Sequence, residues 1–337
     1  MKKALRKSVK GAVIALPMRV LVAFVPRDVI CLFYHVVSEQ PIIHADHLYA
    51  HRPLELFEND LQFLVKNYAP ITYDELWRNR EEGRPLSKKA VHLSFDDGFV
   101  ECYDLARPLL LKYGVPCTFF LATNFIDNHR MYYRNQVSLC LEKFWRAEQI
   151  QQKVMCERLN KEFGTGITDG SGFETWVKSL VDEGQVGRVC ETVGVDIPEY
   201  LAQRQPYLTR EQIKQLAAEG FTIGAHSRRH IKLGRLSQEQ AGEEILESCL
   251  VVGRMTGNAR VPFSFPNSGD GLERDFLARI RQDHRAVGLF FDTKGLKQDR
   301  RFIVNRIWAE SPKYNPGGKL DMPEILRRVY QDYLINR

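Results

Sequence analysis

The sequence predicts an α/β fold, because segments with the composition of buried strands alternate with segments of helical apolar spacing along most of the chain. No internal repeat and no low-complexity tract interrupts this alternation. The 337 residues are 44% hydrophobic and 11% aromatic, which is enough to bury a sizeable core and excludes a disordered chain.

Six short segments are predicted as strands, since each is an apolar run of strand length. In chain order they are Val29–Val37, Ala90–Phe95, Pro116–Ala122, Phe221–Ala225, Ala259–Phe265 and Ala286–Phe291. The helices between them are predicted from apolar residues three or four positions apart. They are expected at Pro53–Tyr68, Ala106–Tyr113, Thr209–Glu219, Gln238–Met255 and Pro323–Leu334. Gly114 ends the second helix. Thr209 begins the third, because Thr209 and Gln212 have the spacing of a capping box.

Residues 128–205 differ in character from the rest of the chain. They are rich in Gln, Glu, Lys and Arg, and apolar residues follow a helical spacing through Val137–Leu159 and again through Phe173–Leu180. The stretch Gly164–Gly172 has the composition of a loop between the two. We therefore expect a mostly helical insertion at 128–205.

The positive charge of the chain is confined to its start. The protein has 48 basic and 42 acidic residues, and the first 28 residues contain one acid and seven bases, namely Lys2, Lys3, Arg6, Lys7, Lys10, Arg19 and Arg27. The remaining 309 residues are therefore neutral overall. This balance argues against a nucleic-acid-binding body, which needs a cationic face on the folded domain.

Residues 1–28 are interpreted as a separate basic and apolar segment, with the main domain at 29–337. Pro17 and Arg19 interrupt its apolar run, which disfavours a cleaved signal peptide or a membrane span. As a helix, residues 1–26 would carry apolar residues on one side and lysines on the other, which suits an anionic membrane surface. A helix that covers the floor of the domain fits equally well, and an uncleaved signal-anchor is a lesser alternative.

The seven cysteines are scattered, and no CxxC pair occurs. A disulfide scaffold and a thiolate zinc site are therefore disfavoured, and a reducing compartment is the simpler interpretation. The expected location is cytoplasmic, at the inner face of the cell membrane if the N-terminal segment binds it.

Two adjacent carboxylates provide the strongest signal for chemistry. Asp96 and Asp97 follow the strand Ala90–Phe95, and Gly98 permits a sharp turn after them. In an α/β barrel the carboxyl ends of the strands are where active sites form. One carboxylate can bind a metal while the other stays free as a base. A plain surface turn is the alternative.

Two histidines follow another predicted strand. His226 and His230 lie four residues apart after Phe221–Ala225, and they can reach one ion if this loop coils into a helical turn. With one Asp they would give a site of three protein ligands that leaves a position for water.

Together these motifs resemble the NodB-type polysaccharide deacetylases, carbohydrate esterase family 4. The resemblance is carried by SFDDG at 94–98, GAHSRRH at 224–230, FSFPNSG at 263–269 and FYHVV at 33–37. It covers roughly residues 29–127 and 206–310. It implies an irregular (β/α)7-type barrel of parallel strands, interrupted here by the insertion, and the hydrolysis of N-acetyl groups on amino sugars with a divalent metal.

The resemblance also implies roles for the residues of the first two motifs. Asp97, His226 and His230 become the metal ligands and Asp96 the general base. Zinc is the expected metal, with cobalt, nickel and manganese as alternatives. Such a metal polarises an amide carbonyl and acidifies water, while a carboxylate free of the metal takes the proton of the attacking water.

The third motif can be aligned with the family's Pro-aromatic-Gly loop in two registers. In the preferred one, Phe265, Pro266 and Asn267 form the loop, the backbone N–H of Asn267 faces the oxyanion, and Phe265 borders the substrate. In the other, Arg260 orients Asp96. Asn267 stands where the family has an aromatic residue, which removes a stacking surface for sugar.

The general acid is left unassigned by the sequence. His284, the only histidine after His230, precedes a strand at the end far from the expected site and is interpreted as structural. A metal-bound water or protonated Asp96 could serve instead. His35 and Arg306 are expected at the mouth of the site as substrate-binding residues, with a buried histidine and a surface ion pair as the respective alternatives.

Three further histidines suggest a second site. His44, His47 and His51 have an HxxHxxxH spacing in a loop over the same end of the barrel. A second metal site there is the less favoured interpretation, because no acid or cysteine in the sequence pattern supports it.

The sequence thus predicts a metal-dependent hydrolase that removes N-acetyl groups from amino sugars of a polysaccharide or a lipid-linked glycan. The insertion leaves from the end of the third strand, so it is expected to be a lid or wall of the site. Two alternatives remain open: a deformylase or deacylase of a small lipid-linked sugar, and a non-catalytic glycan-binding homologue. The expected partner is an N-acetylated glycan or glycolipid.

Overall fold

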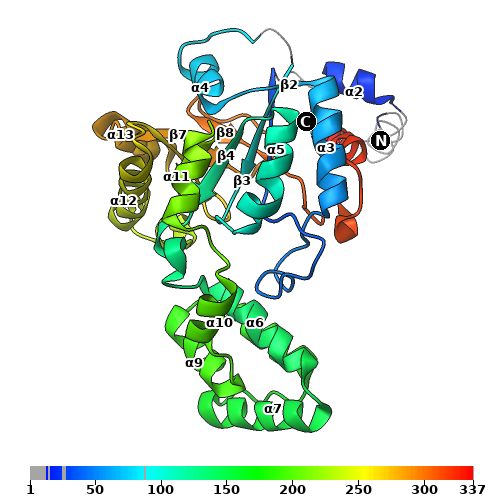
Figure 1. Cartoon of the computed structure of the whole chain (residues 1–337), viewed down its shortest axis with the longest axis vertical. Coiled ribbons are helices and arrows are strands. Elements are labelled where there is room, and N and C mark those ends of the chain that lie inside the picture. Colours follow the sequence, from blue (N-terminus) through cyan, green and yellow to red (C-terminus); the bar gives the residue numbers. More distant parts are fainter. Residues whose placement is uncertain (1–12, 14–15, 25–27, 87–88, 337) are drawn as a thin grey trace, which may run out of the picture.

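A parallel sheet that nearly closes on itself forms the body of the protein (Figure 1). The computed structural model describes residues 13, 16–24, 28–86 and 89–336. The strand order is β8-β7-β6-β5-β4-β3-β1-β9, β2 pairs with β3 off this path, and every pair is parallel. The strands are β1 (Val29–Tyr34), β2 (Ala69–Pro70), β3 (Ala90–Phe95), β4 (Cys117–Leu121), β5 (Thr222–Ala225), β6 (Val261–Ser264), β7 (Val287–Asp292), β8 (Ile303–Asn305) and β9 (Ile307–Trp308).

The first and last strands of this order, β8 and β9, are almost adjacent in the chain. Only Arg306 separates β8 from β9 along the chain, although these strands lie at opposite ends of the order. The sheet therefore comes close to a full barrel, which confirms the predicted α/β barrel. The observed bounds of all six predicted strands agree with the expected ones to within three residues.

Helices pack around the outside of the barrel, strand side chains such as Phe120 and Phe291 fill its interior, and every residue of β1, β3 and β7 is buried. They are α3 (Leu54–Asn67), α4 (Tyr73–Glu81), α5 (Arg107–Tyr113), α11 (Arg210–Ala218), α12 (Gln238–Thr256), α13 (Arg274–Asp283) and α14 (Met322–Ile335). Short helical segments of other types lie at Cys102–Ala106, Thr123–Asn128, Leu233–Arg235 and Pro316–Gly318, and the second and fourth contain residues with non-helical backbone angles. Thr209 and Gln212 make both bonds of the predicted capping box, and Gly114 ends α5 with a left-handed φ of 61°.

The insertion consists of five helices. They form a bundle that protrudes from one end of the barrel (Figure 1). Ala147 and Glu148 have extended backbone angles and divide the predicted run Val137–Leu159 into two helices, the second of which starts at a capping box of Glu148 and Gln151. The bundle has its own apolar core, which includes Phe144 and Phe173. Its helices are α6 (Tyr133–Arg146), α7 (Gln149–Phe163), α8 (Gly170–Ser179), α9 (Glu183–Val193) and α10 (Ile197–Arg204).

Part of the N-terminal segment packs on the barrel. Helix α2 (Met18–Phe24) contacts α14, and the side chain of Leu21 is fully buried. Arg327 donates a hydrogen bond to the carbonyl of Leu16 at 3.0 Å, and Lys89 donates one to the carbonyl of Val22 at 2.6 Å. Residues 1–12, 14–15 and 25–27, on which the predicted membrane contact mainly rests, lie outside the described residues. In the described part of the chain, no helix combines the length and the apolar character needed to cross a membrane.

Candidate active site

The predicted site residues meet in one cleft at the carboxyl ends of the strands. The parallel register pairs Tyr34 of β1 with Phe95 of β3 and Leu121 of β4 with Ala225 of β5, so the residues that follow these strands emerge side by side. The cleft has a volume of about 1060 Å³. Its lining includes the predicted residues His35, Asp96, Asp97, His226, His230, Phe265, Asn267 and Arg306.

A tight turn separates the two adjacent carboxylates. Asp97 and Gly98 both have left-handed backbone angles, with φ of 72° and 75°. Glycine suits this position because of its positive φ, and a Cβ atom there would also displace the end of the Leu121 side chain, whose Cδ2 would lie 2.9 Å away. The turn sends Asp96 toward the barrel interior and Asp97 toward the two imidazoles.

Asp97, His226 and His230 form a cluster that fits a divalent metal. Oδ1 of Asp97 lies 2.9 Å from Nε2 of His230 and 3.5 Å from Nε2 of His226, and one ligand atom from each residue lies within 4.8 Å of the others. All three side chains are buried, and Oδ1 of Asp97 accepts no hydrogen bond. A buried carboxylate oxygen beside two imidazole nitrogens is a donor set that suits zinc.

The loop that carries the two histidines is not the helical turn that the sequence suggested. Ser227 and His230 have left-handed φ angles of 62° and 55°, and Oγ of Ser227 accepts a hydrogen bond from the backbone N–H of His230 at 3.0 Å. Glu244 of α12 accepts hydrogen bonds from the backbone N–H groups of Arg228 and Arg229. The expectation of a helical turn was therefore wrong, because this network folds the loop back in another way.

A backbone contact fixes the orientation of His226. Its Nδ1 lies 2.8 Å from the carbonyl oxygen of Ser264, which can only accept a hydrogen bond. Nδ1 must therefore carry a proton, and Nε2 is the ring nitrogen that faces the cluster. Burial opposes the ionisation of Asp97, but the neighbouring imidazoles of His230 and His226 hold the pKa of this carboxyl well below its ordinary value.

Asp96 is held by a bidentate arginine. The guanidinium of Arg306 donates to Oδ1 and Oδ2 of Asp96, each at 2.7 Å, and also donates to the hydroxyls of Ser94 and Ser264. Burial opposes the ionisation of Asp96, yet the charge and hydrogen bonds of Arg306 outweigh it and lower the pKa of this carboxyl. Asp96 is therefore ionised at neutral pH.

Arg306 lies deeper than the sequence suggested. Its side chain has no exposed surface, and its guanidinium carbon lies 4.3 Å from the centre of the Phe33 ring and 5.2 Å from that of Phe120. This burial corrects the alternative of a surface ion pair, whereas the expected contact of Arg306 with substrate stays a prediction, because the residue lines the cleft. The role that one register gave to Arg260 also fails, because Arg260 lies over the ring of Trp77.

His35 borders the cleft and is paired with an acid from the far end of the chain. Its Nδ1 lies 3.0 Å from Oε2 of Glu310. The Glu310 carboxylate also accepts hydrogen bonds from the backbone N–H of His35, and from that of Val36 at Oε1. Burial disfavours the imidazolium, but the hydrogen bond and charge of Glu310 outweigh it and raise the pKa of His35 to about 9. His35 is thus protonated at neutral pH, with Nε2 directed away from Glu310.

The residues of the third motif lie partly in the core and partly at the cleft. Phe265 has no exposed surface and stacks on Phe290 behind the wall of the cleft, and its contact with substrate stays a prediction. Pro266 is buried, whereas Asn267 is exposed at the cleft in a left-handed conformation with φ of 63°. Among the described residues, no group accepts a hydrogen bond from the backbone N–H of Asn267. It remains available to a ligand, as the preferred register requires.

The three histidines of the HxxHxxxH pattern have separate partners. His44 contacts the hydroxyl of Tyr200, His47 contacts Glu142, and His51 contacts Asp46. The second metal site was therefore a wrong interpretation, since the three imidazoles do not converge. His284 is exposed just after α13 and precedes β7, which agrees with its predicted place away from the site.

Sequence reasoning missed three residues around His35. The hydroxyl of Tyr49 donates to Oδ2 of Asp97 at 2.9 Å, and its ring stacks on His35 with centroids 4.5 Å apart. Nε1 of Trp308 donates to Glu310 at 2.9 Å. No local pattern marks Tyr49, Trp308 or Glu310, because each belongs to a segment whose partners lie far away in the sequence.

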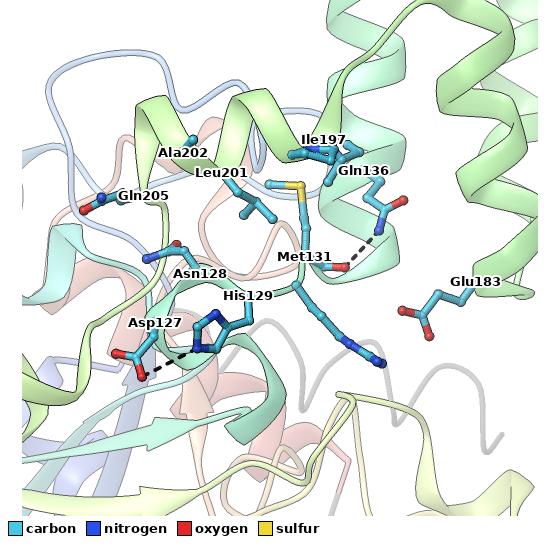
Figure 2. A pocket seen from close by; sticks show the side chains of 12 residues that line it. Asp127, Asn128, His129, Met131, Gln136, Glu183, Ile197, Leu201, Ala202 and Gln205 are labelled. Carbon is cyan, nitrogen blue, oxygen red and sulfur yellow. Dashed lines mark hydrogen bonds and ion pairs between the residues drawn. The ribbon is translucent and has the colours of Figure 1, made fainter.

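A second pocket lies at the junction between the barrel and the insertion (Figure 2). It has a volume of about 650 Å³, and Asp127 and His129 at its rim face one another at 4.0 Å. Met131 and Leu201 contribute apolar side chains to its lining. None of the predicted site residues lines this pocket.

Comparisons with known proteins agree with this geometry. The family model for polysaccharide deacetylase matches residues 83–289. The poly-β-1,6-N-acetyl-D-glucosamine N-deacetylase of Staphylococcus epidermidis is 35% identical over 209 residues, which are 61% of this chain and 64% of that protein. The chain thus spans less than two thirds of the length of this curated relative.

Two solved structures share the fold. The deacetylase PplD of Streptococcus pyogenes, solved in complex with acetate, has a TM-score of 0.55 and 16% identity, over 90% of this chain and 97% of that one. IcaB from Ammonifex degensii also has a TM-score of 0.55, with 15% identity over the same shares. At this level of identity the likeness concerns the fold alone.

Proposed function

Because this chain belongs to the polysaccharide deacetylase family, we propose that it removes N-acetyl groups from the amino sugars of a polysaccharide by metal-dependent hydrolysis. The observation that carries the proposal is the convergence in one cleft of an Asp-His-His cluster, an ionised carboxylate and a protonated histidine. The named activity of the Staphylococcus epidermidis relative supports a polymer of N-acetylglucosamine as the substrate class.

The proposed metal ligands are Asp97, His226 and His230. Their donor set fits zinc best, and cobalt, nickel or manganese accept the same donors. A divalent ion bound there supplies Lewis acidity to an amide carbonyl oxygen and to water. The remaining chemistry belongs to side chains and backbone groups of this chain.

Asp96 is the proposed general base. Its carboxylate stays ionised because Arg306 holds it, and it accepts the proton that the attacking water loses as the carbon–oxygen bond forms. The backbone N–H of Asn267 is the proposed donor to the oxyanion that develops on the carbonyl oxygen. Arg306 acts through Asp96 as a positioning residue.

His35 is the proposed general acid. Glu310 occupies Nδ1, so the proton on Nε2 is the one that His35 can give to the amine nitrogen as the carbon–nitrogen bond breaks. The products are then acetate and a free amine on the sugar. This assignment fills the role that the sequence left open.

Glu310→Gln is expected to narrow the pH range of activity from its alkaline side. The wild-type rate should fall as pH rises through the pKa of His35 at about 9, because the acid is then lost. Without the Glu310 carboxylate that pKa drops, so the alkaline limb of kcat/KM should move to lower pH by roughly 1–3 units. Profiles of kcat/KM against pH for the metal-loaded enzymes measure this shift.

The matched control for this change is Glu58→Gln, because Glu58 is a surface carboxylate that pairs with Lys112 and lies outside the cleft. It should leave the profile unchanged. An alkaline limb that stays in place in Glu310→Gln would remove His35 from the role of general acid.

The test of the function is the release of acetate from defined oligomers of β-1,6-linked N-acetylglucosamine, offered with zinc, cobalt or nickel. Acetate and free amines in equal amounts are expected. Release of formate from N-formylated sugars alone would favour the deformylase alternative. Binding of the oligomers with no release would favour the glycan-binding alternative, and either result would overturn the proposal.

The insertion is proposed to form one wall of the substrate cleft. Tyr132, Arg134 and Lys178 of this region line the cleft, and the ring of Tyr132 lies 4.3 Å from that of His230. These contacts support a wall that borders the bound glycan close to the metal ligands.

A further inference from the structure

The loop between β1 and α3 brings a tyrosine into contact with two different parts of the cleft. The hydroxyl of Tyr49 donates to Oδ2 of Asp97 at 2.9 Å. The ring of the same residue stacks on His35, with centroids 4.5 Å apart and an interplanar angle of 29°. One side chain therefore contacts both the proposed metal ligand and the proposed acid.

The first contact determines which oxygen of Asp97 is free. Because Oδ2 is engaged by Tyr49, the carboxylate presents Oδ1 to the imidazoles of His226 and His230. Oδ1 is buried and accepts no hydrogen bond. A hydrogen bond to the outer oxygen of a ligating carboxylate fixes its orientation, and such partners typically contribute 10- to 100-fold to metal affinity.

The same loop is held by the insertion and not by the barrel alone. Oγ of Ser138, a fully buried residue of α6, donates to the carbonyl of Ile43 at 2.7 Å and accepts from the backbone N–H of His47 at 3.3 Å. Asn135 of α6 donates to the carbonyl of His44 at 2.7 Å, and Glu142 contacts the ring of His47 at 2.9 Å. Helix α6 thus contacts the loop along three consecutive turns, just before Tyr49.

We propose that Tyr49 is a positioning residue that orients Asp97 for the metal and steadies His35, and that helix α6 of the insertion holds Tyr49 in place. The inference rests on the proposed function only in treating Asp97 as a metal ligand and His35 as the acid. On this proposal the insertion has a second role besides bordering the glycan. Its helix α6 contacts the loop that carries Tyr49, and Tyr49 contacts the proposed metal ligand Asp97.

Tyr49→Phe is expected to lower the affinity for zinc by about 10- to 100-fold, since it removes the hydroxyl and leaves the ring. Competition with a chromophoric chelator measures this affinity on the full chain in the absence of glycan. The matched control is Tyr113→Phe, which also removes a phenol hydrogen bond to a carboxylate, that of Glu58 at 2.8 Å, outside the cleft. Wild-type zinc affinity in Tyr49→Phe would overturn the proposal.

Steady-state kinetics at saturating zinc separate the two contacts of Tyr49. Tyr49→Phe keeps the ring against His35, so kcat should recover most of its wild-type value once the metal is loaded. Tyr49→Leu loses the stack as well, and its kcat should stay low with KM little changed. Equal kcat values for the two loaded variants would refute the contact with His35 as a functional one.

A double-mutant cycle tests the part of the proposal that concerns the insertion. Ser138→Ala should weaken zinc binding in the wild-type background and have little effect in the Tyr49→Phe background, with a coupling of roughly twofold or more. Ser179→Ala is the control, because its hydroxyl bonds only within α8, to the carbonyl of Trp176 at 2.6 Å. Equal effects of Ser138→Ala in both backgrounds would contradict the link between insertion and metal site.

These measurements remain decisive if the proposed function fails. Zinc affinity and its change in Tyr49→Phe are measured without substrate, so they do not depend on acetate release. Thermal unfolding of each apo variant separates a loss of the fold from a loss of the site.

Discussion

Asp96→Asn is expected to bind zinc as tightly as the wild-type protein and to lose about 10²–10⁴-fold in kcat. The amide has nearly the size of the carboxylate and can still accept a hydrogen bond from Arg306. It cannot accept a proton from the attacking water. Asp96 is not within the cluster of ligand atoms formed by Asp97, His226 and His230, so metal content should be unaffected. Zinc stoichiometry and single-turnover acetate release measure the two effects separately.

The control for this change must also break a buried arginine–aspartate pair. Asp60→Asn does so, because Asp60 is 1% exposed and accepts two hydrogen bonds from Arg52, at 2.9 and 2.6 Å, in the same bidentate manner. Both variants should lower the free energy of unfolding, since a buried guanidinium loses its counter-charge. Only Asp96→Asn should lose turnover in the folded fraction. Turnover close to wild type in Asp96→Asn would remove Asp96 from the role of base.

His230→Ala is expected to abolish both stoichiometric zinc binding and activity. It leaves only Oδ1 of Asp97 and Nε2 of His226, and two protein donors do not hold zinc as three do. The loss of affinity should exceed the roughly 10- to 100-fold effect of a partner that contacts a ligand from outside. Metal analysis after dialysis, together with acetate release at increasing zinc concentrations, measures the loss.

His284→Ala is the matched control, because this histidine is exposed beyond the end of α13. It should keep zinc and turnover. Bound zinc at wild-type stoichiometry in His230→Ala would show that the metal lies elsewhere. The two variants should therefore differ in metal content. His230→Ala should lose the metal, whereas Asp96→Asn should keep the metal and lose only the proton acceptor.

Much of the fold and of the candidate metal-binding cluster could be predicted from the sequence, because both depend on local patterns. The strand Ala90–Phe95 and the helix that begins at Thr209 are encoded by short runs of residues whose apolar spacing and capping groups act within a few positions. Asp97 and His226 lie within two residues of the end of a buried strand, and His230 lies four residues beyond His226. Since parallel strands end at one edge of the barrel, the meeting of these side chains followed once the strands had been identified.

The division of Val137–Leu159 into two helices had a weaker local signal. Its apolar spacing continues across the break, and the capping box of Glu148 and Gln151 is made by residues that are equally common inside helices.

The conformation of the histidine loop was predicted wrongly for a different reason. Its conformation depends on Glu244 of α12, which binds the backbone of the loop from another element.

The sequence by itself determined the class of fold, the site at the strand ends, and the residues fit to bind a metal. Each of these depends on the pattern of residues within one short segment of the chain. Only the tertiary structure decided which groups tune that site. Arg306 reaches Asp96 across 210 residues of sequence, Glu310 reaches His35 across 275, and Tyr49 reaches Asp97 from a loop held by the insertion. These contacts arise from the near closure of the barrel, where the C-terminal strand β9 pairs with β1 and places its flanking residues beside the first strand. No local pattern specifies them, since charge, burial and orientation at the site are set by neighbours in space.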